Sequence, residues 1–111
     1  MKTSTRNVDG VEIISLQGKI TIGSGDSQLR DIIGDTLKQG KTKILLDMKG
    51  VTTIDSSGIG ELVGSYTTAT NRGGKLKLLH LPPKVTDLLQ VTQLITVFEV
   101  YENEQEAIKS F

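Results

Sequence analysis

The chain has 111 residues, with 13 basic and 13 acidic side chains and a formal net charge of zero. This length suits a single domain over residues 1–111, and a neutral chain has no overall field that would favour nucleic acid or an anionic membrane as a partner. The chain holds no cysteine, which excludes disulfides, thiol catalysis and thiolate zinc sites. It also lacks an apolar run of about 18 residues and a charged and apolar leader, so we expect a cytoplasmic protein without direct membrane insertion.

The first third of the chain predicts a hairpin followed by a helix. Segments 2–8 and 11–18 flank Asp9-Gly10, a dipeptide that accepts the positive φ angles of a tight turn between antiparallel strands. Apolar residues then recur at helical spacing from Ser27 to Gln39, and Gly40 marks the end of this helix. The candidate capping residues are Ser24, Asp26 and Ser27.

The middle of the chain predicts a buried strand, a helix and a second strand. Segment 43–48 is an almost continuous apolar run, which is typical of a parallel strand covered on both faces. The next apolar residues have helical spacing and predict a helix that Gly58 opens and Gly73-Gly74 ends. Its apolar positions are Ile59, Leu62, Val63, Tyr66 and Ala69. Segment 75–81 alternates as a strand does.

The last third predicts a helix, a strand and a final helix. Pro82-Pro83 opens the first of these, because proline is tolerated where its missing N–H would have no intrahelical partner. Segment 96–101 predicts the last strand, and Asn103 with Glu106 resembles a helix-capping pair. The resulting order, β-β-α-β-α-β-α-β-α, favours an α/β fold with a mixed, mostly parallel sheet.

Three consecutive polar residues, Asp55, Ser56 and Ser57, follow the central predicted strand. The first N–H groups of a helix lack internal acceptors and carry a partial positive charge, so a side chain can cap them and a phosphate is favoured there. One interpretation is that one of these residues is only an N-cap. Three polar residues followed by Gly58 and Gly60 exceed the needs of a cap, which indicates that some other group approaches this backbone closely.

A hydrolytic nucleophile at Ser56 or Ser57 is disfavoured. A nucleophile elbow needs glycine two residues before the serine, and Ile54 and Asp55 stand there instead. The one histidine, His80, is expected to be a half-exposed loop residue.

Nucleotide binding through the glycines is also weakly supported. Gly58, Gly60 and Gly64 have the spacing G-x-G-x-x-x-G, which misses the dinucleotide fingerprint, and no P-loop lysine follows. Glu61 would oppose a bound phosphate. The residues therefore predict no cofactor and no metal site.

The polar face of the helix that starts near Gly58 favours a protein partner. It carries Ser57, Gly60, Glu61, Gly64 and Thr68. Glycine in a helix interior costs about 1 kcal/mol relative to alanine, and the small residues make this face flat. A flat face beside an exposed serine suits protein docking better than a small-molecule pocket. The alternative is that these are tolerated surface residues.

Three segments, TTIDSSGIGELVGSY, GGKLKLLHLPPKVTDLLQVTQL and VFEVYENEQEAI, resemble the STAS domain and particularly the bacterial anti-sigma-factor antagonists. The most specific part is the run from Asp55 to Gly60, supported by Gly18 and Gly73-Gly74. The resemblance spans nearly the whole chain. It implies a single STAS domain that has no enzymatic activity of its own.

The resemblance also implies a phosphorylation switch. In that family an anti-sigma factor that is also a serine kinase phosphorylates the serine directly after the aspartate, here Ser56, and a serine phosphatase removes the phosphate. The unphosphorylated form binds the anti-sigma factor and releases the sigma factor, whereas the phosphorylated form does not bind. Ser57, deeper in the helix start, is expected to cap or support the helix.

One loop departs from the family pattern. Members often carry an acidic and apolar segment after the second strand, where this chain has Lys19–Gly25, and this loop helps to meet the partner. The departure concerns the choice of partner rather than the fold. The expected partner-binding residues are Asp55, Ser57, Gly58, Gly60, Glu61, Gly64, Thr68, Gly23 and Ser24. Because other STAS domains serve in membrane lipid or anion transport complexes, the alternative is a transport subunit that acts without phosphorylation.

Overall fold

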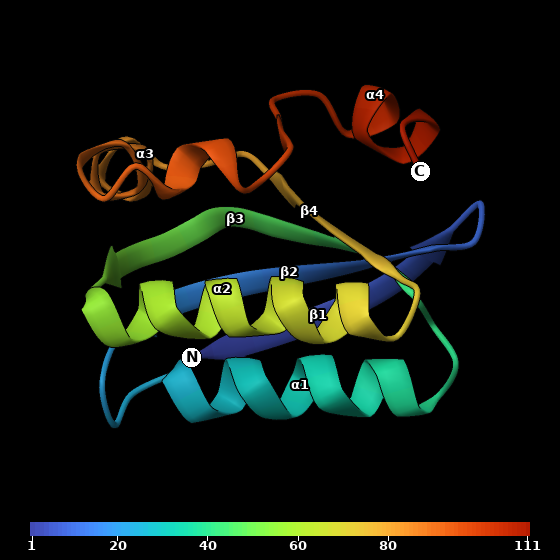
Figure 1. Ribbon diagram of the computed structural model, residues 1–111, viewed down its shortest axis with the longest axis horizontal. Helices are drawn as coiled ribbons and strands as arrows, with labels where there is room; N and C mark the ends of the chain where they lie inside the picture. Colours follow the sequence, from blue (N-terminus) through green and yellow to red (C-terminus); the bar gives the residue numbers. More distant parts are fainter.

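The computed structural model describes residues 1–111 as one mixed sheet with helices on both sides (Figure 1). The strands are β1 Lys2–Val8, β2 Val11–Ile20, β3 Lys43–Ile54, β4 Lys75–Leu79 and β5 Val100–Tyr101, and the helices are α1 Asp26–Lys38, α2 Ser56–Asn71, α3 Pro83–Val91 and α4 Glu104–Lys109, with a short 3-10 helix, η1, at Leu94–Thr96. The strand order is β1-β2-β3-β4-β5, in which only β1 and β2 are antiparallel. The predicted α/β fold and element order are confirmed. No helix is long and apolar enough to cross a membrane.

The hairpin forms where the sequence predicts it. Asp9 and Gly10 have φ angles of 52° and 83°, and Val8 pairs with Val11. Successive positive φ angles match the twist of the two strands, so the turn fixes their register. Strand β2 therefore enters the sheet with its apolar residues buried.

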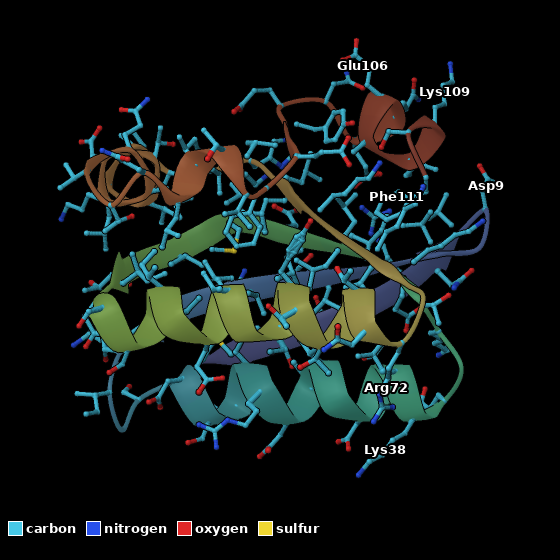
Figure 2. All side chains as sticks on the ribbon, viewed as in Figure 1. Asp9, Lys38, Arg72, Glu106, Lys109 and Phe111 are labelled. Atoms are coloured by element: carbon cyan, nitrogen blue, oxygen red, sulfur yellow. The ribbon has the colours of Figure 1, made fainter.

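Strand β3 is central and separates two apolar clusters. Ile44 and Leu46 are buried in the larger cluster together with residues of α1 and α2, whereas Leu45 is buried in the smaller one. The smaller cluster also holds Ala107 of α4, and Phe111 lies between α4 and the sheet (Figure 2). The prediction that this strand is covered on both faces is confirmed.

The predicted last strand over 96–101 is wrong for most of its length. Only Val100–Tyr101 pairs with β4, and Thr96 is the last residue of η1. Phe98 turns its ring into the core, where the ring centroid lies 5.5 Å from that of Tyr66. The apolar pattern of this segment therefore serves packing rather than strand pairing.

The predicted strand over 75–81 ends early, at Leu79, because His80 has a φ angle of 55°. Left-handed backbone does not continue a β-ladder, and it redirects the chain into Pro82.

Helix α1 starts without any of the predicted side-chain caps. Gly25, with a φ angle of 95°, occupies the cap position and makes no side-chain cap bond. A Cβ atom at Gly25 would overlap the carbonyl oxygen of Lys19. The close approach of β2 to the helix start therefore requires glycine, and Asp26 accepts a hydrogen bond from Ser27 N–H instead, at 2.8 Å.

Candidate functional site

The carboxylate of Asp55 joins the start of α2 to the loop between β2 and α1. Its Oδ1 atom accepts a hydrogen bond from Gly58 N–H at 2.9 Å, and its Oδ2 atom accepts one from Ile22 N–H at 3.0 Å. Asp55 is thus the N-cap, and α2 begins at Ser56, two residues before the predicted start. Of the two roles expected for Ser57, that of a cap is wrong, because the extended Asp55 is the residue whose side chain reaches back to the free N–H groups. Its role in supporting the helix start stays a prediction.

These two hydrogen bonds keep Asp55 ionised. The backbone N–H of Ile22 lowers the pKa of this carboxyl most, followed by that of Gly58, and partial desolvation opposes them. Hydrogen bonds to the charged form of an acid stabilise that form. The site therefore holds a fixed negative charge beside Ser56.

We expect the Asp55→Asn variant to be less stable than wild type at neutral pH. In acid the difference in unfolding free energy between the two proteins should disappear. A carboxyl whose folded-state pKa lies below its ordinary value of 3.8 adds stability above that value, and this stability disappears as the pH falls through the folded-state pKa. The asparagine side chain offers one acceptor oxygen for two N–H groups. Urea unfolding of both proteins from about pH 2 to about pH 7 measures the difference.

The control for this prediction is Asp87→Asn, which removes an exposed acid from α3. A gap between wild type and Asp55→Asn that stays constant down to about pH 2 would contradict the role given to the ionised carboxylate.

The two serines differ in their setting. Ser56 is the first residue of α2 and is exposed, whereas Ser57 is half-buried. Because Asp55 supplies the cap, neither hydroxyl is needed for it. Ser56 therefore presents a free hydroxyl to solvent at the positive end of a 16-residue helix.

Gly58 lies beneath this surface. It is buried, and a Cβ atom there would overlap the carbonyl oxygen of Ile20 and lie 2.7 Å from Cγ1 of Ile54. Its part in the site is to let the start of α2 rest against the end of β2. Gly60 and Gly64 differ from it, because open space surrounds the position of a Cβ atom at each.

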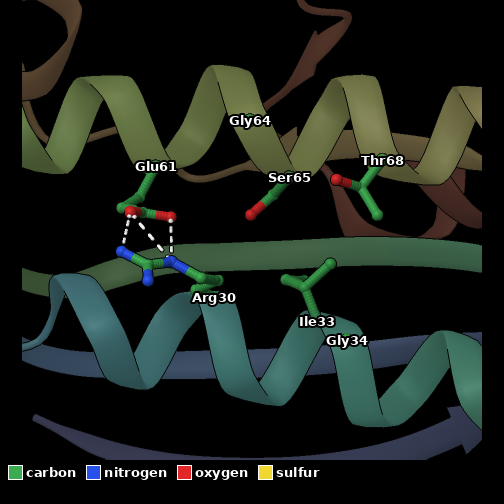
Figure 3. Close-up of a pocket in the computed structure, with 7 residues that line it drawn as sticks. All are labelled: Arg30, Ile33, Gly34, Glu61, Gly64, Ser65 and Thr68. Atoms are coloured by element: carbon green, nitrogen blue, oxygen red, sulfur yellow. Dashed lines mark hydrogen bonds and ion pairs between the residues drawn. The ribbon is translucent and has the colours of Figure 1, made fainter.

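The polar face of α2 borders α1 rather than standing free. Glu61 pairs with Arg30 of α1, with 2.6 Å between Oε1 of Glu61 and Nη2 of Arg30 (Figure 3). This pairing is the main cause that raises the pKa of Arg30. Gly64 and Thr68 line the same shallow groove, whose volume is about 310 Å³. Arg30 was missed by sequence reasoning, because nothing local marks it.

Gly23 and Ser24 belong to the loop that Asp55 holds. Ser24 N–H donates to the Thr21 carbonyl at 2.9 Å, and Thr21 N–H donates to the Ser24 carbonyl at 2.7 Å, so the loop is a tight turn. At its tip Ile22 is 75% exposed, although it is a large apolar residue. Sequence reasoning missed Ile22 too, and an apolar residue within a glycine- and serine-rich loop was the available signal.

His80 makes its side-chain contact away from both serines. Its Nδ1 atom lies 3.2 Å from Oδ1 of Asp47, on the neighbouring strand β3. Neither serine is paired with a histidine, so the arrangement of a serine hydrolase is absent from this site.

Comparisons with known proteins agree with this geometry. The STAS domain family matches residues 2–107. The anti-sigma F factor antagonist of Paenibacillus polymyxa is 28% identical over 100 residues, which cover 89% of this chain and 85% of that protein. The crystal structure of an anti-sigma factor antagonist from Mycobacterium paratuberculosis is 21% identical, with a TM-score of 0.85 over 98% of this chain and 92% of the other. The Bacillus cell fate determinant SpoIIAA in the phosphorylated form is 24% identical, with a TM-score of 0.74 over 98% of both chains. Because the family match covers nearly the whole length, the chain belongs to the STAS domain family.

Proposed function

We propose that the protein is an anti-sigma-factor antagonist whose binding is controlled by phosphorylation of Ser56. The observation that carries this proposal is the exposed Ser56 hydroxyl at the start of α2, beside a carboxylate that already caps the helix. The unphosphorylated form binds an anti-sigma factor with serine kinase activity and thereby releases the sigma factor. A serine phosphatase restores this form. The protein itself is a cytoplasmic binding module and substrate, with no cofactor.

The proposed docking surface consists of the start of α2, its small-residue face and the loop between β2 and α1. Its residues are Asp55, Ser57, Gly60, Glu61, Gly64, Thr68, Gly23 and Ser24, with Gly58 as the packing residue beneath them. Phosphorylation adds a charge of about −1.5 to −2 next to the ionised Asp55. A close interface over this surface would then have to bury two neighbouring negative groups, which opposes binding.

The relatives support the general role. The Paenibacillus polymyxa protein bears the name anti-sigma F factor antagonist, and SpoIIAA has been solved in its phosphorylated and unphosphorylated forms. A phosphate on Ser56 would face the N-terminus of α2, where the helix dipole stabilises negative charge. The switch therefore needs no rearrangement of the fold.

The Ser56→Ala variant should accept no phosphate from the cognate kinase while still binding it. Alanine removes the hydroxyl but leaves the Asp55 cap in place and adds no charge to the docking surface. Ser56→Asp should bind more weakly, because it places a second carboxylate beside Asp55. Incubation with the serine kinases of the same genome and ATP, mass mapping of the phosphorylated residue and calorimetric titration of the kinase measure these outcomes.

Ser57→Ala is the matched control and should accept phosphate as wild type does. If the kinase labels Ser56→Ala as fast as wild type, the modified residue is Ser57 or a threonine such as Thr53. If the kinases label neither the variants nor wild type, a STAS subunit of a transport complex that acts without phosphorylation becomes the better proposal.

A further inference from the structure

The groove between α1 and α2 is lined almost entirely by small residues and by one ion pair at its rim. Its lining residues are Arg30, Ile33, Gly34, Glu61, Gly64, Ser65 and Thr68 (Figure 3). Its volume of about 310 Å³ is at the lower end of the range for binding pockets. The groove has room for one large side chain.

Two glycines line this groove, although neither position requires glycine for steric reasons. Gly34 of α1 and Gly64 of α2 lie inside helices, and nothing lies within 4 Å of a Cβ atom built at either position. Alanine would fit both sites and would favour the helices. A side chain at either site would narrow the groove. The feature that these glycines preserve is therefore the open space of the groove.

Ser65 supplies a second and independent observation. This residue is only 4% exposed, and Figure 3 shows its hydroxyl directed from α2 into the groove. None of the side-chain hydrogen bonds of the structure involves this hydroxyl. Every fully enclosed polar side-chain atom of the protein does have a partner. The Ser65 hydroxyl is therefore a nearly buried donor and acceptor whose open direction is the groove.

We propose that the groove binds a phenol ring, in the form of a tyrosine side chain from the docking protein, whose hydroxyl bonds to Ser65. A flat ring can lie in the groove against the backbones at Gly34 and Gly64, above the buried Ile33. An aliphatic side chain would fill the same space but would leave the Ser65 hydroxyl unpaired, which is unfavourable in a desolvated site. Tyrosine joins a large apolar area to a polar tip and is common at the centres of protein interfaces.

The rim of the groove favours a neutral aromatic ligand over an acid. The Arg30 side chain is 64% exposed, so its guanidinium can lie against a ring that enters the groove. Glu61 neutralises Arg30 and would repel a carboxylate placed beside it. The charges at the rim thus match an aromatic ring.

This inference rests on the proposed function only for the identity of the docking protein, since the phenol site is a property of the chain alone. The probes are p-cresol, which has the side chain of tyrosine, and toluene, which lacks the hydroxyl. In NMR titrations p-cresol should shift the amide signals of Gly34, Gly64, Ser65 and Thr68, and toluene should bind about threefold to tenfold more weakly. Absence of shifts at these amides up to the solubility of p-cresol overturns the proposal.

Two variants separate the hydroxyl contact from the space. Ser65→Ala should reduce p-cresol binding to the level of toluene and leave toluene binding unchanged. Gly34→Leu fills the groove and should abolish binding of both probes, while Asp35→Leu, at the adjacent residue that lines a separate hollow beside β1, should leave both unchanged. If Ser65→Ala still prefers p-cresol to toluene as wild type does, the proposed hydrogen bond to Ser65 is wrong. If p-cresol still binds Gly34→Leu, it binds outside the groove, which overturns the proposal.

A further experiment measures binding of the kinase that phosphorylates Ser56. Gly34→Leu should weaken its binding at least about tenfold relative to Asp35→Leu. If Gly34→Leu binds the kinase as wild type does, the tyrosine inference fails and the proposed switch stands. If no kinase binds or labels wild type, the proposed function fails, and the p-cresol titration still decides the groove.

Discussion

Replacing Gly58 with alanine is expected to lower the free energy of unfolding by about 2–3 kcal/mol, because the added methyl group would overlap the carbonyl oxygen of Ile20. The backbone of β2 cannot yield as a flexible side chain would, so the start of α2 must move outward. Such a shift would also lengthen the hydrogen bond from Gly58 N–H to Asp55. Urea unfolding monitored by circular dichroism measures the loss.

The control is Gly60→Ala, two residues further along the same helix. Nothing lies within 4 Å of a Cβ atom there, so alanine should raise the free energy of unfolding by about 0.5–1 kcal/mol. Opposite signs for the two substitutions are the expected result. Equal effects would mean that the start of α2 does not press against β2.

Leu45→Ala should cost about 2–5 kcal/mol of unfolding free energy, because it leaves a cavity at a fully buried position. Leu45 lies on the central strand and packs with Ile13, Leu79 and Ala107 in the smaller apolar cluster. The loss should therefore loosen α4 as well as the sheet. Chemical denaturation gives the overall value, and hydrogen exchange of the α4 amides reports the local effect.

Lys43→Ala is the matched control on the same strand. Lys43 is exposed, and its replacement should change the unfolding free energy by less than about 0.5 kcal/mol. A small loss for Leu45→Ala, similar to that for Lys43→Ala, would place β3 at the periphery and contradict the central position of this strand.

Much of the fold could be predicted because its signals are local. Asp9-Gly10 turns the first hairpin through its own backbone angles, and Asn103 caps α4 by accepting a hydrogen bond from Glu106 N–H at 3.0 Å. The apolar run at Ile44–Leu46 indicated a strand buried on both faces. Each of these features depends on residues within a few positions of one another.

The errors in the fold arise where packing overrides a local pattern. Segment 96–101 is rich in the β-branched and aromatic residues of a strand, yet the ring of Phe98 packs against Tyr66 of α2, 32 residues earlier in the chain. Strand β4 stops at Leu79 because His80 adopts left-handed backbone, a conformation that few non-glycine residues take. Neither constraint is visible in the neighbouring residues.

The candidate site shows the same division between local and distant causes. The run Asp55-Ser56-Ser57 could be recognised from the sequence as a helix start, because a helix start and its cap are determined by consecutive residues. The choice of Ser56 over Ser57 rests on the resemblance to the anti-sigma-factor antagonists and stays a prediction. Only the tertiary structure decided that the Asp55 carboxylate also holds Ile22, 33 positions away, and that Glu61 pairs with Arg30, 31 positions away. Such partners are chosen by how α1, α2 and the end of β2 pack together, and side chains so far apart in sequence meet only after the core between these elements has formed.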